Sequence, residues 1–314
     1  MEFLSQYGLF LLKSVTVVIA FLLILAGFFS FSRKPKPLVE VTSLNTHYEN
    51  FHTIMNKQVH NIKPEKKKKK KGGKQSSPSL FVIDFNGDIK ASQVEQLREE
   101  ISAILSIAKQ DDEVLIRLES PGGSVNGYGL AAAELQRIRD KKIPLTVCID
   151  KVAASGGYLM ACVANQILAA PFAIIGSIGV VAQIPNFHRL LKKNNVDIEL
   201  LTAGDYKRTL TLLGENTEVG RKKFQEDLEK IHLAFKKYLL AHRGQLDMDK
   251  VSTGEHWLAT DAFDLRLVDK IITSDQYLIE KMNIFKAFKI SVHVKGSIIN
   301  KLLKPIMNLM HPWG

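Results

Sequence analysis

The chain has 314 residues, of which 46% are hydrophobic and 24% charged. This composition suits a globular protein of one or two domains and excludes a wholly disordered chain or a collagen-like repeat. A small disulfide scaffold is also excluded, because there are only two cysteines. Most of the net charge of +11 lies in the leader: residues 1–79 hold 13 Lys and Arg against 4 Asp and Glu, whereas residues 80–314 hold 30 against 28. A nearly neutral folded part argues against nucleic-acid binding.

An apolar segment opens the chain. Residues 14–31 carry no charge, and at about 1.5 Å per residue this run nearly crosses a hydrocarbon core of about 30 Å. A cleaved signal peptide is the alternative, but basic residues follow the run at 33–36 in place of a small-residue cleavage site. The sequence therefore predicts a single-span transmembrane anchor over residues 1–32, with residues 8–32 in contact with lipid.

A basic linker follows at residues 33–79. It contains six consecutive lysines at 66–71, then two glycines and the polar sequence QSSPS. Such a segment cannot bury apolar surface, so we expect the linker to be partly disordered. The lysine run suits either a solvated tether or contact with anionic headgroups. Basic residues after the anchor would place the bulk of the chain in the cytoplasm by the positive-inside rule.

From residue 80, short apolar runs alternate with segments of helical spacing. Near-continuous apolar strands that alternate with helices indicate βαβ units and a mostly parallel sheet covered on both faces. The expected strands are 80–85, 113–118, 144–149, 166–170, 173–184 and 198–201, and the expected helices are 92–109, 125–140, 154–164, 185–195 and one from Thr217 to Gly244. We expect an α/β domain at 80–275 and a C-terminal extension at 276–314, made of a helix, a strand and an amphipathic tail.

The long helix after Thr217 carries an apolar stripe at helical spacing, which core packing explains best. Its members are Phe224, Leu228, Ile231, Phe235 and Leu239.

Glycine-rich stretches lie at the ends of the expected strands. SPGGS at 120–124 separates a strand from a helix, and its backbone N–H groups suit an anion or an oxyanion. Ser155 lies in AASGG, where small neighbours leave its hydroxyl approachable, as a nucleophile requires; an N-capping serine is an equal alternative. GSIGV at 176–180 precedes a polar loop with Lys207. Taken alone, a loop lysine is usually a solvated surface charge.

Taken in order, these segments resemble a known family. SPGG, AASGGY, GSIGV, AGDYKRT and TGEHWLATDAFDLRLVDKI are similar to the signal peptide peptidase A / SohB family of membrane-bound serine–lysine peptidases. The segments around SPGG and AGDYKRT look closest to the SohB branch. The resemblance covers roughly residues 80–275 together with the anchor. It implies a ClpP/crotonase-like fold of repeated ββα and βαβ units.

The resemblance also implies roles for individual residues. Ser155 would be the nucleophile, Lys207 the general base, and Ser177 the hydrogen-bond partner of the lysine amine. The oxyanion hole would be formed by backbone N–H groups near three glycines: Gly122, Gly123 and Gly156.

This chemistry requires an uncharged lysine. At its free pKa of about 10.4 a lysine is protonated and cannot accept a proton from serine. Burial disfavours the ammonium and lowers the pKa, which makes the amine a usable base. The reaction needs no metal and no cofactor.

Three other functions stay open. A Ser-His-Asp protease on the same fold would use His188, His242 or His256. A catalytically inactive membrane scaffold would keep the fold without the chemistry. A crotonase-type acyl-CoA enzyme would need an acidic catalyst such as Glu119, which stands where the family more often has Asn or Asp.

The sequence thus predicts a membrane-anchored serine endopeptidase in the bacterial inner membrane, without nucleic-acid partners. Its substrates would be peptides near the bilayer, such as signal-peptide remnants or misfolded membrane-associated chains. We expect a homo-oligomer, because one subunit supplies too little wall to enclose a substrate. The resemblance suggests the periplasmic face, whereas the lysine-rich flank suggests the opposite one, so the side of the membrane stays open.

Overall fold

The computed structural model describes residues 2–31, 38–61 and 77–293. Two compact units divide the chain: residues 1–39 with 292–314, and residues 40–291. The lysine run at 66–71 and the amphipathic tail lie outside the described residues.

The first unit contains helix α1, Glu2–Phe31. The side chains of residues 6–21 of α1 are exposed. In the part of the chain that the structure describes, no helix is long and apolar enough to cross a membrane. The transmembrane anchor over residues 1–32 stays a prediction.

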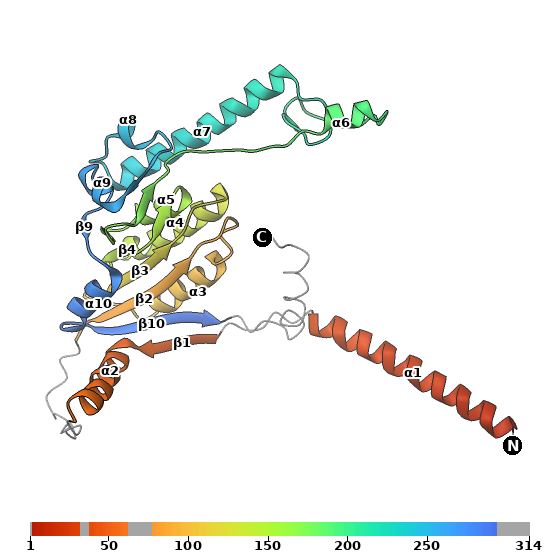
Figure 1. Cartoon of the computed structure of the whole chain (residues 1–314), viewed down its shortest axis with the longest axis horizontal. Helices are drawn as coiled ribbons and strands as arrows, with labels where there is room; N and C mark the ends of the chain where they lie inside the picture. The colour runs from red at the N-terminus through yellow and green to blue at the C-terminus, as the bar shows by residue number, and fades with distance from the viewer. Residues whose placement is uncertain (1, 32–37, 62–76, 294–314) are drawn as a thin grey trace. The chain divides into compact units, whose positions relative to one another are not determined.

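The second unit is built on a seven-stranded sheet in the order β1-β10-β2-β3-β4-β6-β9 (Figure 1). All described pairings from β10 through β9 are parallel, which confirms the predicted α/β class with a mostly parallel sheet. The strands are β1 Leu38–Ser43, β2 Ser79–Asn86, β3 Glu113–Glu119, β4 Leu145–Ile149, β6 Gln166–Ala169, β9 Lys270–Ile271 and β10 Lys286–His293.

A second, three-stranded sheet follows the order β5-β7-β8. Its strands are β5 Val152–Ala154, β7 Ile174–Gly176 and β8 His256–Leu258. β5 is parallel to β7, and β7 is antiparallel to β8. A bridge between Ser120 and Ala153 joins the end of β3 to β5, so the two sheets meet where β3 ends.

Helices cover both faces of the large sheet, because alternate residues of each strand point to opposite sides. Phe81, Ile83 and Phe85 of β2 join the core beneath α3, α4 and α5. Leu80 and Val82 join the second core, which includes residues of α2 and α10. The helices of this unit are α2 Leu44–Val59, α3 Val94–Leu105, α4 Val125–Asp140, α5 Gly156–Ala161, α6 His188–Lys193, α7 Glu218–His242, α8 Met248–Val251, α9 Ala259–Asp264 and α10 Ser274–Met282.

Several element boundaries differ from the prediction. The expected linker contains β1 and α2, and the expected strand at 173–184 is only β7. Residues 198–201 form no strand, because their backbone has no neighbouring strand in the described chain. α7 begins after Thr217 as predicted, where the Thr217 hydroxyl accepts a hydrogen bond from the N–H of Gly220 at 3.1 Å.

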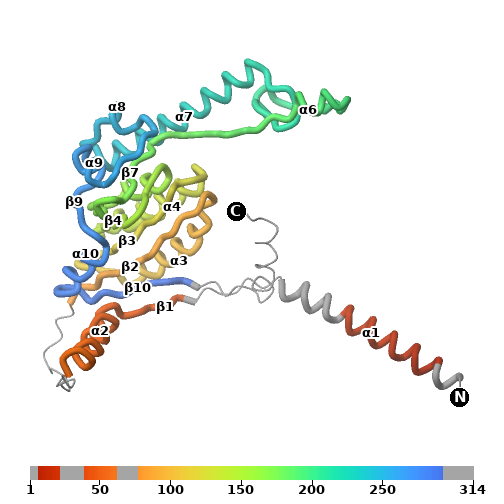
Figure 2. The backbone as a smooth tube through the Cα atoms, viewed as in Figure 1, coloured from red at the N-terminus to blue at the C-terminus, as the bar shows by residue number. Residues whose placement is uncertain are grey.

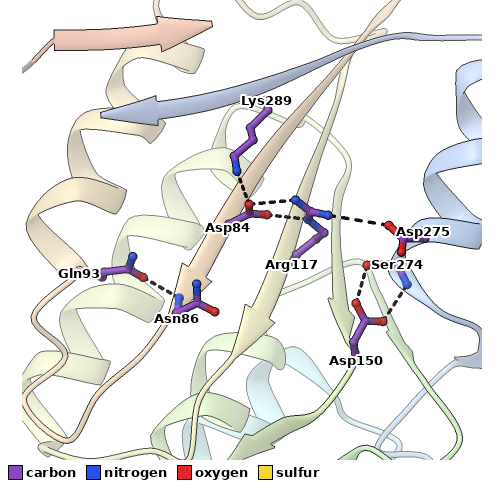
Figure 3. A network of polar contacts seen from close by, with 8 residues as sticks. All are labelled: Asp84, Asn86, Gln93, Arg117, Asp150, Ser274, Asp275 and Lys289. Atoms are coloured by element: carbon purple, nitrogen blue, oxygen red, sulfur yellow. Dashed lines mark hydrogen bonds and ion pairs between the residues drawn. The ribbon is translucent and has the colours of Figure 1, made fainter. Parts of the chain in front are cut away.

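A charged network ties β10 to the centre of the sheet (Figure 3). The guanidinium of Arg117 on β3 donates two hydrogen bonds to the Asp84 carboxylate on β2, at 2.6 and 2.9 Å. Lys289 of β10 approaches the same carboxylate at 2.7 Å. Burial raises the pKa of Asp84, but the hydrogen bonds from these two cations outweigh it and hold the pKa below its ordinary value of 3.8.

A neighbouring contact fixes the start of α10. Asp150, just after β4, accepts hydrogen bonds from the backbone N–H of Ser274 at 2.9 Å and from its hydroxyl (Figure 3). The C-terminal elements α10 and β10 are therefore held on the sheet by carboxylates that follow or lie within its central strands.

We expect Asp84→Asn to lower the free energy of unfolding at pH 7 by about 2 kcal/mol, because two partly buried cations lose their anionic partner. A carboxyl whose pKa is lowered by folding stabilises the protein above its unfolded pKa, and this contribution is lost as the pH falls. The difference between wild type and variant should therefore shrink below pH 3.8. Urea titrations at several pH values measure it.

Glu95→Gln is the matched control for this variant, since the Glu95–Arg98 pair is exposed on the surface of α3. It should change stability by less than about 0.5 kcal/mol. An equal loss of stability in both variants would contradict the stabilising role of the Asp84 carboxylate. A loss of stability in Asp84→Asn that is unchanged at low pH would also contradict it.

Candidate active site

Ser155 lies in the sharp turn between β5 and α5. Its backbone has φ 52° and ψ −118°. This is close to the conformation of the first central residue of a type II′ turn. Glycine normally occupies that position, because its φ is positive. A serine there is strained. Its side chain makes no capping hydrogen bond, so the N-cap interpretation is wrong and the hydroxyl is available for other chemistry.

The glycine loop after β3 packs directly on this turn. Gly122 has φ +89°, and a Cβ there would lie 2.7 Å from the Cβ of Ser155 and 2.9 Å from the backbone N of Gly156. Only glycine allows so close an approach. The loop that was expected to bind an oxyanion therefore touches the residue that was expected to be the nucleophile.

The N–H groups of the three expected oxyanion donors are not equivalent. Gly122 donates to the Ser120 hydroxyl at 3.1 Å, so its N–H is already satisfied. Within the described residues, the N–H groups of Gly123 and Gly156 donate to no carbonyl or side chain. These two remain available to an oxyanion.

Ser177 is brought beside Ser155 by strand pairing. β5 and β7 run parallel with Ala154 opposite Gly176, so the residue that follows each strand leaves the sheet at the same edge. The N–H of Ser155 then donates to the carbonyl of Gly176 at 2.8 Å. Ser177 also has a positive φ of 52°, and its N–H donates to the carbonyl of Glu255 at 2.6 Å.

A cleft of about 1090 Å³ contains five of the six predicted site residues. These are Ser155, Ser177, Gly122, Gly123 and Gly156. Its walls are largely apolar and include Ile89, Val125, Leu159, Val180, Ile231 and Phe235. A cleft of this size can hold an extended peptide with bulky apolar side chains beside Ser155 and two free N–H donors.

Lys207, the sixth predicted site residue, does not line this cleft. It lies in the segment between β7 and α7, where its side chain is exposed and its N–H donates to the carbonyl of Gly204. Figure 2 shows this segment, with α6, leading away from the two sheets beside α7. Within one chain the structure therefore does not bring Lys207 to Ser155.

The α7 stripe has a role that its spacing did not reveal. Leu239 is fully buried in the core as predicted, but Ile231 and Phe235 line the cleft. His232 and Tyr238 of the same helix line it as well. A core stripe and a cleft wall share the same helical period, so the sequence alone could not separate them.

The structure bears on two of the rival functions. None of the histidines considered for a Ser-His-Asp site lines the cleft; they are His188, His242 and His256. His242 is instead hydrogen-bonded to the carbonyl of Tyr238 and the side chain of Gln136.

Glu119 pairs with Lys151 at 2.9 Å and also lies outside the cleft. The described cleft lining contains no carboxylate, so it offers no acid for crotonase-type chemistry.

The comparisons with known proteins agree with one another on the family. The model described as peptidase family S49 N-terminal matches residues 2–135, and the peptidase family S49 model matches residues 137–287. The chain is 47% identical to the probable protease SohB of Haemophilus influenzae, over 96% of this chain and 92% of the relative. It is 48% identical to the probable protease SohB of Buchnera aphidicola subsp. Schlechtendalia chinensis, over 90% of this chain and all of the relative.

Solved structures are more distant. A serine-to-alanine variant of a membrane-bound stomatin-specific protease is 17% identical, with a TM-score of 0.43, over 66% of this chain and 86% of that one. A lysine-to-alanine variant of the stomatin-specific protease, in complex with a substrate peptide, is 14% identical, with a TM-score of 0.41, over 74% of this chain and 99% of that one. Two family models that together span most of the sequence, and relatives of nearly the same length, lead to one conclusion: the chain belongs to peptidase family S49.

Proposed function

We propose that this chain is a serine endopeptidase with Ser155 as nucleophile and Lys207 as general base. The observation that carries the proposal is the strained turn at Ser155, which holds an uncapped hydroxyl in the cleft beside two free N–H donors. Membership of a peptidase family supports this assignment. The largely apolar walls favour substrates with apolar side chains.

The reaction follows from these groups. Ser155 Oγ forms a bond to the scissile carbonyl carbon while its proton passes to the Lys207 amine. The oxyanion is stabilised by the N–H groups of Gly123 and Gly156. Lys207 then returns the proton to the leaving amine as the C–N bond breaks, and water releases the acyl group by the same route. Ser177 would orient the lysine amine.

We further propose that Lys207 reaches this site from a neighbouring copy of the chain in a homo-oligomer. In one chain Lys207 is exposed to solvent and lies outside the cleft, so it does not reach Ser155 there. The same segment exposes large apolar side chains, with Val181 and Leu201 about nine-tenths exposed, at 91% and 90%. Packing this segment against a second copy would bury these side chains and remove water from the lysine.

Anchoring to the bacterial inner membrane is the remaining part of the proposal. It is supported by the uncharged run at residues 14–31 and by the helical conformation of α1. A catalytic cleft tethered near a bilayer would encounter membrane-associated peptides, including signal-peptide remnants and misfolded chains. The side of the membrane is left open.

Two substitutions at the nucleophile separate chemistry from strain. Ser155→Ala and Ser155→Gly should both abolish peptide hydrolysis and labelling by a serine-reactive phosphonate, because each removes the hydroxyl. Ser155→Gly should also raise the free energy of unfolding by about 1 kcal/mol relative to Ser155→Ala, because glycine adopts this positive φ without strain. Denaturant titration measures the second effect. Hydrolysis by either variant would disprove the nucleophile assignment.

Mixing inactive variants tests where the base comes from. Ser155→Ala and Lys207→Ala should each be inactive alone, because each lacks one partner of the dyad. Co-expressed and purified as mixed oligomers in detergent, they should recover roughly one quarter of wild-type activity, since about one site in four would combine an intact serine with an intact lysine of the neighbour.

Lys193→Ala is the control, since it removes another lysine of the same segment. It should stay active. Activity in Lys207→Ala alone would rule out the dyad. Inactive mixtures would show that serine and lysine act within one chain.

A further inference from the structure

A buried chain of hydrogen bonds runs behind the glycine loop. The N–H of Gly122 donates to Ser120 Oγ at 3.1 Å, Ser120 Oγ lies 2.6 Å from the hydroxyl of Tyr128, and Tyr128 donates to the carbonyl of Asp88 at 2.8 Å. Tyrosine has a single hydroxyl proton, and the Asp88 carbonyl receives it. Ser120 must therefore donate to Tyr128, and every member of the chain has a fixed role.

The two hydroxyls of this hydrogen-bond chain are buried away from water. Ser120 and Tyr128 are both 0% exposed. Burial raises the pKa of Tyr128, so its hydroxyl stays protonated and remains a donor. In such surroundings a hydrogen-bond chain is strong when every member is satisfied, and the loss of one member leaves a costly unpaired group.

Ser120 also contacts the strand that leads to the nucleophile. Its N–H donates to the carbonyl of Val152 at 2.8 Å, and its carbonyl accepts from the N–H of Ala154 at 3.0 Å. Its side chain holds Gly122, as described above. One buried serine thus joins the glycine loop to β5, directly before Ser155.

The ring of Tyr128 supports the other oxyanion donor. A Cβ built on Gly156 would collide with the Cβ and ring carbons of Tyr128, so the Gly156 backbone rests directly on this side chain. The hydroxyl of Tyr128 acts on the Gly122–Gly123 loop through Ser120, while its ring supports the start of α5. Tyr128 is therefore placed between the two backbone segments that carry the free N–H groups.

We propose that Tyr128 and Ser120 are positioning residues that set the separation of the Gly123 and Gly156 N–H groups around the carbonyl attacked by Ser155. The inference rests on the proposed function and assigns these two residues a part in it. Tyr128 also lines the cleft, but its hydroxyl and that of Ser120 are engaged in the hydrogen-bond chain. Their effect is transmitted by the backbone of Gly122 and of Gly156.

The consequence is a selective loss in the chemical step. Oxyanion donors act only on charge that develops in the transition state, so misplacing them lowers kcat and leaves substrate binding nearly unchanged. Removal of a whole oxyanion donor typically lowers kcat by about 100-fold or more, and a donor that is only shifted lowers kcat by less. We expect Tyr128→Phe to lower kcat by roughly tenfold with KM changed less than about twofold.

Tyr277→Phe is the matched control in the same full-length chain. Tyr277 is also a buried tyrosine whose hydroxyl is hydrogen-bonded, to Glu113 and Thr146, but it lies on α10 in the opposite core and does not line the cleft. The variant Tyr277→Phe should lose stability, as Tyr128→Phe does, but it should keep the wild-type kcat. A kcat loss in Tyr277→Phe equal to that in Tyr128→Phe would overturn the inference.

Ser120→Ala breaks the same chain of hydrogen bonds at its other hydroxyl. It provides the test of the positioning role if Tyr128→Phe does not fold. It should also lower kcat with little effect on KM. Where both single variants fold, the kcat of the double variant Ser120→Ala/Tyr128→Phe should be no lower than that of the slower single variant. Each substitution breaks the same chain of hydrogen bonds, so the second adds no further loss. Independent, multiplicative losses, or a rise in KM at constant kcat, would overturn the positioning role.

Ser155→Ala, measured in parallel, separates the inference from the proposed function. Hydrolysis by Ser155→Ala would overturn both. If Ser155→Ala is inactive while Tyr128→Phe and Ser120→Ala match wild type, only the positioning role falls.

Discussion

The site depends on the close approach of two backbone turns, one after β3 and one after β5. No side chain fits at Gly122 or Gly156, and Ser155 adopts a backbone conformation that glycine normally takes. Such an arrangement persists only when the surrounding structure fixes it. The parallel pairing of β3 with the central sheet, the bridge from Ser120 to Ala153 and the pairing of β5 with β7 supply that support. Strain at Ser155 is thus balanced by the packing of two sheets.

Polar contacts are used differently on the two sides of this fold. Away from the cleft, Asp84 and Asp150 hold the C-terminal elements on the sheet through charged or hydroxyl partners. Behind the cleft, a neutral chain through Ser120 and Tyr128 fixes the glycine loop. A neutral chain suits that position, because a buried charge beside the oxyanion would change the electrostatics of the reaction itself.

Local signals allowed much of this to be predicted from sequence. Apolar runs and helical periods indicate the parallel sheet. The glycine-rich turns mark the segments that meet in the cleft, whereas the choice of the five residues within them depends on the family resemblance. The strand predicted at 198–201 is wrong, because a buried strand and an exposed apolar segment have the same apolar sequence; Leu201 is 90% exposed. Ile231 and Phe235 were assigned to the core for a similar reason. The pairing of Ser120 with Tyr128 has no periodic signature, since it depends on how a loop folds back on the helix that follows it.

The position of Lys207 links catalysis to assembly in the proposed mechanism. A single chain presents the cleft with Ser155 and the free N–H groups of Gly123 and Gly156, but its Lys207 is exposed to water and lies outside that cleft. A base supplied by a neighbour would become uncharged only when the interface removes that water. Under this arrangement an unassembled chain holds a complete cleft yet cannot activate Ser155. Desolvation of one amine would then both create the base and confine proteolysis to the assembled protein.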